Sequence, residues 1–126
     1  MKKNNIETID KLNIELIDGD RGKNYPSKTE FTKSGHCLFL NTSNVTNEGF
    51  NFNEVDFISK KKDNLLGKGK VKYNDIILTT RGTVGNVAYI DEDLKYKDIR
   101  INSGMLIIRT NPKIIDPYYL YLFLRS

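Results

Sequence analysis

The chain has 126 residues and is poor in the residues that form disulfides, zinc sites and membrane spans, with one cysteine, one histidine and no tryptophan. Cys37 cannot form a disulfide within the chain, which is typical of a protein of the reducing cytoplasm. A single cysteine and a single histidine cannot supply the four nitrogen or sulfur ligands of a structural zinc site. The longest apolar runs, such as residues 105–108, are far shorter than the roughly 20 residues of a membrane-spanning helix. We therefore expect a cytoplasmic protein without a membrane span.

The chain also lacks the patterns of nucleotide hydrolysis and of thiol catalysis. Neither Gly22-Lys23 nor Gly69-Lys70 has the upstream glycine and the following serine or threonine of a phosphate-binding loop. His36 and Cys37 are neighbours in an expected strand, where adjacent side chains point to opposite faces, so they cannot pair as base and nucleophile. We expect Cys37 in the core and His36 toward the surface.

The composition is sufficient for a folded domain with a hydrophobic core. Hydrophobic residues make up 38% of the chain, and seven tyrosines and six phenylalanines can contribute to a core. The length fits one domain, expected over residues 1–126. The formal net charge is +4, and the basic residues gather locally, since residues 60–72 hold six lysines and one aspartate. Such a cluster is typical of a nucleic-acid contact, but a solvated surface explains it equally well.

The order of elements favours an α+β fold dominated by sheet, with short helices. Residues 60–66 are expected to form one helical turn closed by Gly67, and Asp116 is an N-cap for a helix that begins at Pro117. Residues 41–53 are expected to be loop, because they are rich in Asn, Thr, Ser and Gly. The expected strands cover residues 13–18, 37–40, 55–59, 75–80, 85–90 and 104–109, with a hairpin between 75–80 and 85–90.

Six segments of the chain resemble, in order and spacing, the target recognition domain of a type I restriction-modification specificity subunit. The most specific of them is DIILTTRGTVGNVAY at residues 75–89. The others are DGDRGKNYP (18–26), LNTSNV (40–45), KGKV (68–71), INSGMLII (101–108) and PYYLYLFLRS (117–126).

This resemblance implies a domain without catalytic activity that reads one half of a bipartite site in double-stranded DNA. It implies modification (methyltransferase) and restriction subunits as partners, with S-adenosylmethionine, magnesium and ATP bound only by those partners. It also implies that the helix from Pro117 continues into a long spacer helix. Similar domains occur at the C-terminal end of fused single-chain restriction-modification enzymes, which is an alternative setting for this chain.

The residue types in the loops agree with DNA binding. Arginine and asparagine pair with guanine and adenine edges, whereas lysine, hydroxyl and backbone amide groups hold phosphates. The residues around Arg21 also fit a polar turn, and Arg81 is better suited to scaffold or backbone contact than to base reading. The candidate DNA contacts are Arg21, Lys23, Asn24, Tyr25, Ser27, Asn44, Lys68, Lys70, Thr80, Arg81, Thr83, Arg100, Asn102 and Ser103.

Two rival functions belong to other classes. Asp75, Asp93 and Lys95 weakly match the acidic residues and lysine of a metal-dependent nuclease, although Asp93 and Lys95 also fit a solvated charged turn. A barrel that binds single-stranded nucleic acid would use aromatic stacking platforms, for which Tyr25, Phe39 and Tyr89 are the candidates.

Overall fold

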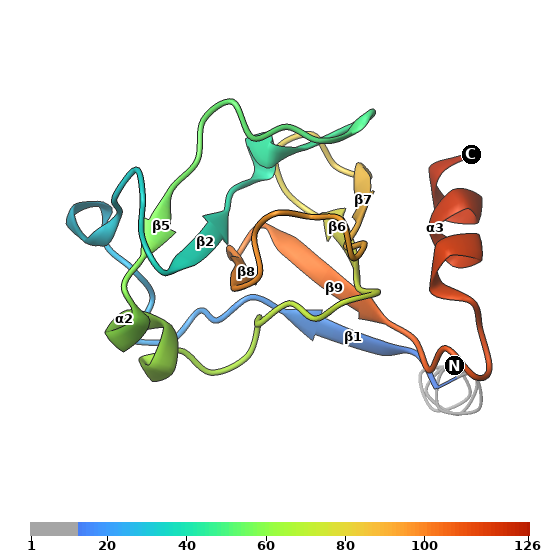
Figure 1. Cartoon of the computed structure of the whole chain (residues 1–126), viewed down its shortest axis with the longest axis horizontal. Coiled ribbons are helices and arrows are strands. Elements are labelled where there is room, and N and C mark those ends of the chain that lie inside the picture. Colours follow the sequence, from blue (N-terminus) through green and yellow to red (C-terminus); the bar gives the residue numbers. More distant parts are fainter. Residues whose placement is uncertain (1–12) are drawn as a thin grey trace.

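The computed structural model of the protein describes residues 13–126 (Figure 1), so the expected domain 1–126 begins outside the described part. Two short 3-10 helices, η1 (Lys28–Glu30) and η2 (Thr42–Asn44), precede the helices α2 (Lys60–Leu65) and α3 (Pro117–Arg125). The strands are β1 (Glu15–Asp18), β2 (Cys37–Leu40), β3 (Val45–Thr46), β4 (Gly49–Phe50), β5 (Phe57–Ile58), β6 (Ile76–Thr79), β7 (Val87–Tyr89), β8 (Ile99–Ile101) and β9 (Met105–Arg109).

One sheet has four antiparallel strands in the order β1-β9-β6-β7. Isoleucine dominates its centre because β-branched side chains fit a pleated, buried surface. Ile77 of β6 pairs with Ile107 of β9 and faces the main core, whereas the neighbouring pair of Ile76 and Ile108 faces α3. The expected hairpin of β6 and β7 is confirmed.

A second sheet has three strands in the order β5-β2-β8, with β2 and β8 parallel. All four residues of β2 are buried, because Leu38 and Leu40 face the main core while Cys37 and Phe39 pack in a separate cluster with Ile58 and Leu66. This burial on both faces explains why β2 is a continuous apolar run rather than an alternating one.

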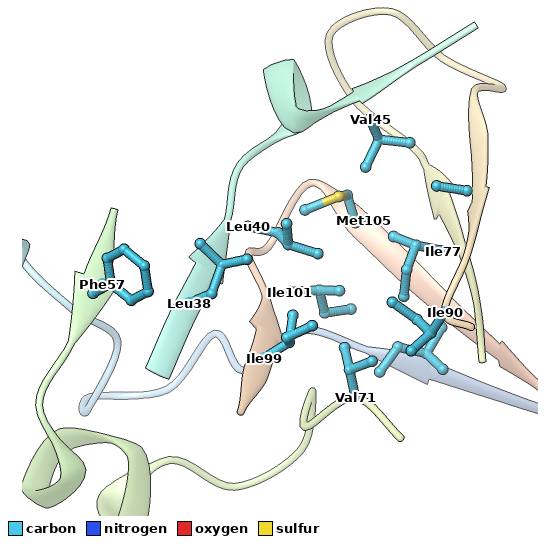
Figure 2. Close-up of a cluster of buried hydrophobic side chains, with 12 residues drawn as sticks. Leu38, Leu40, Val45, Phe57, Val71, Ile77, Ile90, Ile99, Ile101 and Met105 are labelled. Atoms are coloured by element: carbon cyan, nitrogen blue, oxygen red, sulfur yellow. The ribbon is translucent and has the colours of Figure 1, made fainter. Parts of the chain in front are cut away.

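The main core lies between the two sheets (Figure 2). Figure 2 shows Leu38 and Leu40 of β2, Ile99 and Ile101 of β8 and Ile77 of β6 pointing toward one another. Full burial of one such aliphatic side chain stabilises the fold by about 1.5–3 kcal/mol.

The helices α2 and α3 begin at residues that satisfy free backbone N–H groups. The Ser59 side chain accepts from Lys62 N at the start of α2, and the Asp116 side chain accepts from Tyr118 N at the start of α3. α3 lies beside β7 (Figure 1) and packs on it through Tyr121, while Tyr119 on its other side is exposed. The expected helix over residues 60–66 is confirmed, but it ends at Leu65 with Leu66 as C-cap.

The α+β prediction is confirmed, with two local corrections. Residues 41–53 are not continuous loop: they contain η2 and the two-stranded ribbon of β3 and β4. The strand β8 was not expected, because Arg100 interrupts its apolar pattern. None of the described helices has the length and apolar character that a membrane span requires.

Candidate nucleic-acid interface

Three segments that are distant in sequence meet at one place, which we call the loop junction: residues 19–25, 67–70 and 102–104. A side chain on Gly19 would lie 2.3 Å from the carbonyl oxygen of Asn102, so only glycine fits there. Gly69 has φ +105° and packs against Gly19, and its carbonyl accepts from Ile101 N at 3.1 Å. The backbones of the three segments are therefore in direct contact.

Asp20 ties two of these segments together through its carboxylate. Oδ2 accepts from Gly67 N and Oδ1 accepts from Gly22 N, both at 2.7 Å. These two backbone donors, Gly67 first, hold the pKa of Asp20 below its usual value because they favour the ionised carboxylate. The carboxylate of Asp20 therefore stabilises the conformation of the two loop segments.

Arg100 closes the loop junction from inside, with 6% of its surface exposed. Nε donates to Asp63 Oδ1 at 2.5 Å, and Nη2 donates to the carbonyls of Asp63 and Leu66. Nη1 donates to the carbonyls of Gly67 and Lys68. The guanidinium thus donates to four backbone carbonyls at and just beyond the end of α2. This corrects the prediction of Arg100 as a DNA contact, since its donors all face the protein.

Lys70 is also held inside the loop junction. Its Nζ lies 2.6 Å from Asp63 Oδ2 and 3.3 Å from Asp98 Oδ1. Burial raises the pKa of Asp63, but the hydrogen bonds from Lys70 and Arg100 outweigh it and leave that pKa below its usual value. Burial likewise lowers the pKa of Lys70, and its bond to Asp63 outweighs this and raises it. Two carboxylates therefore compete with DNA phosphates for this ammonium, and the phosphate contact of Lys70 stays a prediction.

One group of three possible metal ligands occurs among residues 13–126, formed by His36, Asp63 and Asp98. His36 Nε2 lies 3.6 Å from Asp63 Oδ2 and 3.8 Å from Asp98 Oδ2. The ammonium of Lys70 already bridges the two carboxylates. This group is therefore an ion-pair network with its own cation.

The outer face of the loop junction carries exposed cations. Arg21, Lys23 and Lys68 are all exposed. Arg21 Nη2 donates to the carbonyl of Ser103 at 3.2 Å, which holds the guanidinium over residues 102–104. Arg100 holds Lys68 in place by its backbone carbonyl and leaves the ammonium outside. The structure thus brings together Arg21, Lys68 and Ser103, which are distant in sequence.

Asn24 and Tyr25 brace the loop junction from its sides. Asn24 Nδ2 donates to the carbonyl of Leu65 at 3.3 Å, and the Tyr25 hydroxyl accepts from Ser103 N at 3.2 Å. Both residues are partly buried. Their side chains are joined to the scaffold, and each keeps an exposed part beside Lys23.

The turn between β6 and β7, residues 80–86, joins this surface through Gly104. The amides of Thr80 and Arg81 both donate to the Gly104 carbonyl, at 2.9 and 3.2 Å. The Asn102 Oδ1 accepts from Gly104 N at 2.9 Å. Thr80, Arg81 and Thr83 have exposed side chains. We call the loop junction together with residues 80–86 the loop edge.

Two predicted contacts lie elsewhere. Asn44 is 1% exposed, and its Nδ2 donates to the carbonyls of Asn51 and Glu54 at 2.9 Å each. This corrects its prediction as a DNA contact, because the amide holds the loop that leads into β5. Ser27 is exposed and caps η1, with its backbone N–H donating to Glu30.

The nuclease alternative is not supported. Asp75 is 1% exposed and accepts from Arg109 with both oxygens, at 2.9 and 2.8 Å, and from Lys72 N at 2.7 Å. Asp93 lies in an exposed turn and Lys95 is also exposed. The buried carboxylate is occupied by a bidentate arginine, so it is not available to hold a metal ion beside Asp93.

The three aromatic residues predicted as stacking platforms, Tyr25, Phe39 and Tyr89, pack against other aromatic rings. Phe39 is 4% exposed and packs against the rings of Tyr25 and Phe31. Tyr89 lies against Tyr118 and Tyr121 of α3. A base cannot reach the face of Phe39, so Phe39 cannot serve as a stacking platform for single-stranded nucleic acid.

Sequence reasoning missed Asp20 and Asp63, the two acidic residues that organise the loop junction. A signal for Asp20 was present, since an aspartate two residues before a glycine favours a turn in which its side chain accepts a backbone N–H. Asp63 had no such signal, because its partners Lys70 and Arg100 are distant in sequence.

Comparison with known proteins agrees with the family resemblance that the sequence motifs indicated. The family described as type I restriction modification DNA specificity domain matches residues 3–126. The specificity subunit of the type I restriction enzyme EcoBI of Escherichia coli is 34% identical over 76 residues, which cover 59% of this chain and 15% of that subunit. The HindI specificity subunit of Haemophilus influenzae is 25% identical over 111 residues, covering 86% of this chain and 23% of that subunit.

Two solved structures share the fold. The HsdS subunit of Thermoanaerobacter tengcongensis has a TM-score of 0.61 at 15% identity, covering 88% of this chain and 24% of that one. A chain from a structure titled for complex assembly and conformational transition of the type I R-M system has a TM-score of 0.63 at 14% identity, covering 89% and 25%. The chain thus spans about a quarter or less of these relatives. With nearly its whole length matched, the chain belongs to the type I restriction modification DNA specificity domain family.

Proposed function

We propose that the loop edge binds one half of a bipartite target in double-stranded DNA. The observation that carries this proposal is the division of charge at the loop junction. Arg100 and Lys70 are neutralised inside by Asp63 and Asp98, while Arg21, Lys23 and Lys68 remain exposed on the outer face. Positive charge on a braced outer face attracts the phosphate backbone of a duplex.

The surface carries both kinds of group that a sequence reader needs. Lys23 and Lys68 supply flexible ammonium groups for phosphates. The exposed hydroxyls of Thr80 and Thr83 and the half-buried amide of Asn102 supply donors and acceptors for base edges. Arg21 is held over Ser103, which limits the directions in which its guanidinium can point. A restrained arginine suits bidentate contact with guanine better than a free one does.

The proposed setting is the specificity subunit of a type I restriction-modification complex, of which this chain would form one DNA-binding domain. We propose modification and restriction subunits as partners, with S-adenosylmethionine, magnesium and ATP bound by them and no cofactor bound by this chain. A fused single-chain restriction-modification enzyme is the alternative setting, and there too the loop edge would bind the DNA target.

The test is a binding competition with labelled duplex DNA of random sequence against the same strands unpaired. We expect the duplex to be preferred and the Lys68→Ala variant to bind it more weakly. Lys113→Ala is the matched control. Lys113 is exposed and follows the C-terminal end of β9, whereas the N-terminal end of β9 adjoins the loop edge. Equal binding of single strands and duplex, or equal losses for Lys68→Ala and Lys113→Ala, contradicts the proposal.

A further inference from the structure

Two hairpin turns, one of them part of the loop edge, enclose a depression. One turn joins β3 to β4 at residues 46–49, and the other joins β6 to β7 at residues 80–86. The depression has a volume of about 360 Å³. Apart from Val45, its lining residues share one property, which is an uncharged polar side chain: Thr42, Ser43, Thr46, Asn47, Thr83 and Asn86.

The walls of the depression are fixed by hydrogen bonds between and within the turns. Asn86 Nδ2 donates to the carbonyl of Val45 at 3.1 Å and so joins the two hairpins. Thr46 Oγ1 donates to the Gly49 carbonyl and accepts from Glu48 N, which holds the first turn. Asn47 lies within this turn and Thr83 within the other, and both side chains are exposed.

Arginines border the depression on two sides. On one side, a side chain on Gly104 would contact both the methyl of Thr42 and the Cβ of Arg81, so Arg81 lies next to the lining. On the other side, an adjoining depression is lined by Asn47, Asn86 and Arg125, which brings the end of α3 to the same place. Positive charge is thus at the borders and uncharged donors and acceptors are between them, while the exposed Glu48 lies in the first turn without lining the depression.

We propose that this depression reads base edges, with Asn47 and Thr83 as specificity-determining residues. An asparagine amide offers one donor and one acceptor to the N7 and N6 groups of adenine, and a threonine adds a hydroxyl for a neighbouring base edge. Arg81 and Arg125 contact the phosphates on either side of the base that is read. This inference rests on the proposed function, since it assigns the base-reading part of the same DNA surface.

The experiment is selection of bound duplexes from a randomised library by the full chain, followed by sequencing. We expect an adenine at one position of the selected motif to be lost in Asn47→Ala, with its preference falling by about 5-fold to 150-fold. Asn47→Gln keeps the amide and retains part of the preference. Asn53→Ala is the matched control, because Asn53 is an exposed loop asparagine that does not line this depression.

A second variant keeps the inference testable if Asn47→Ala disrupts its turn. Thr83→Val removes only the hydroxyl and is expected to relax one neighbouring position of the motif. An unchanged motif in both Asn47→Ala and Thr83→Val overturns this inference while the proposed function stands. Absence of duplex binding by the unmodified chain overturns the proposed function and this inference with it.

Discussion

Arg100 and Asp63 form a buried ion pair that joins β8 to the end of α2, with Nε and Oδ1 2.5 Å apart. Removing Arg100 leaves Asp63 with Lys70 as its remaining cation and takes the donor away from four backbone carbonyls, so we expect Arg100→Ala to lower the free energy of unfolding by about 3–5 kcal/mol. Urea denaturation measures this. Arg81→Ala is the control, because its exposed side chain predicts a change within about 0.5 kcal/mol. Equal stability of the two variants would contradict the buried role of Arg100.

This pair also marks the limit of what the sequence could predict. Strands β1, β2, β6, β7 and β9 follow from apolar and β-branched runs bounded by turn residues, and Asp116 and Pro117 identify the start of α3. β8 was missed because Arg100 looks like a surface residue until Asp63, distant in sequence, is placed beside it. Local pattern cannot report such a pairing.

The candidate site was predicted in part for the same reason. Residues 18–26, 68–71 and 101–108, which carry the family resemblance, contain most of the loop junction, and the motifs around Arg21 and Lys68 do meet. The sequence could not show which cations face inward. Lys68 and Lys70 are two residues apart with the same chemistry, yet one is exposed and the other is bound by Asp63 and Asp98.

Acid should loosen the loop junction. The pKa values of Asp20 and Asp63 are lowered from 3.8, so the folded state binds fewer protons than the unfolded state near that pH. Their stabilising contribution is complete above the unfolded value of about 3.9 and is lost as pH falls through the lower folded values. We expect the midpoint of urea unfolding to be level near neutral pH and to fall below about pH 4.

The matched measurement for this acid transition uses two aspartate variants. Asp63→Asn should reduce the loss of stability between neutral and acidic pH, because the amide does not titrate. Asp93→Asn should leave that loss unchanged, since Asp93 lies in an exposed turn. An identical pH profile for the original chain and Asp63→Asn would show that this ion pair does not control the transition.

Cys37 should react slowly in the folded protein. It has no exposed surface, and burial raises the pKa of its thiol to about 12, which keeps it protonated at neutral pH. We expect a thiol reagent to label it far more slowly in buffer than in denaturing urea. The raised pKa also predicts loss of stability as pH rises above 9.0, since the unfolded thiol ionises there while the folded one does not. Labelling in buffer at the rate of a free thiol would contradict the burial.

Asp75 should matter for stability and not for cleavage. Its carboxylate binds Arg109 with two hydrogen bonds, so Asp75→Ala is expected to cost about 3–5 kcal/mol of unfolding free energy. Asp93→Ala should change it by less than about 0.5 kcal/mol. Incubation of the purified chain with plasmid and magnesium should give no nicked DNA. Cleavage that disappears in Asp93→Ala would restore the nuclease alternative.

The exposed cations of the loop edge should divide into phosphate contacts and a base reader. A lysine that meets only phosphate releases counterions on binding, so Lys68→Ala should reduce the salt slope of log affinity by roughly 0.9 and affect all duplex sequences alike. Arg21 is restrained by Ser103, so Arg21→Ala should remove roughly 1–3 kcal/mol of discrimination at one base pair at fixed salt. Asn24→Ala should act in the same direction.

Lys70→Ala separates this division of roles from a simple count of charges. It removes the same charge as Lys68→Ala, but its ammonium is bound by Asp63 and Asp98, so it should lower stability and leave the salt slope nearly unchanged. The test is competition between selected and scrambled duplexes at two salt concentrations, with unfolding measured in parallel. It is applied to the alanine variants of Arg21, Asn24, Lys68 and Lys70. If the Lys68 variant loses sequence preference while the Arg21 variant keeps it, the assignment is reversed. If Lys70→Ala flattens the salt dependence as Lys68→Ala does, the inner ion pair does not withhold that charge from DNA.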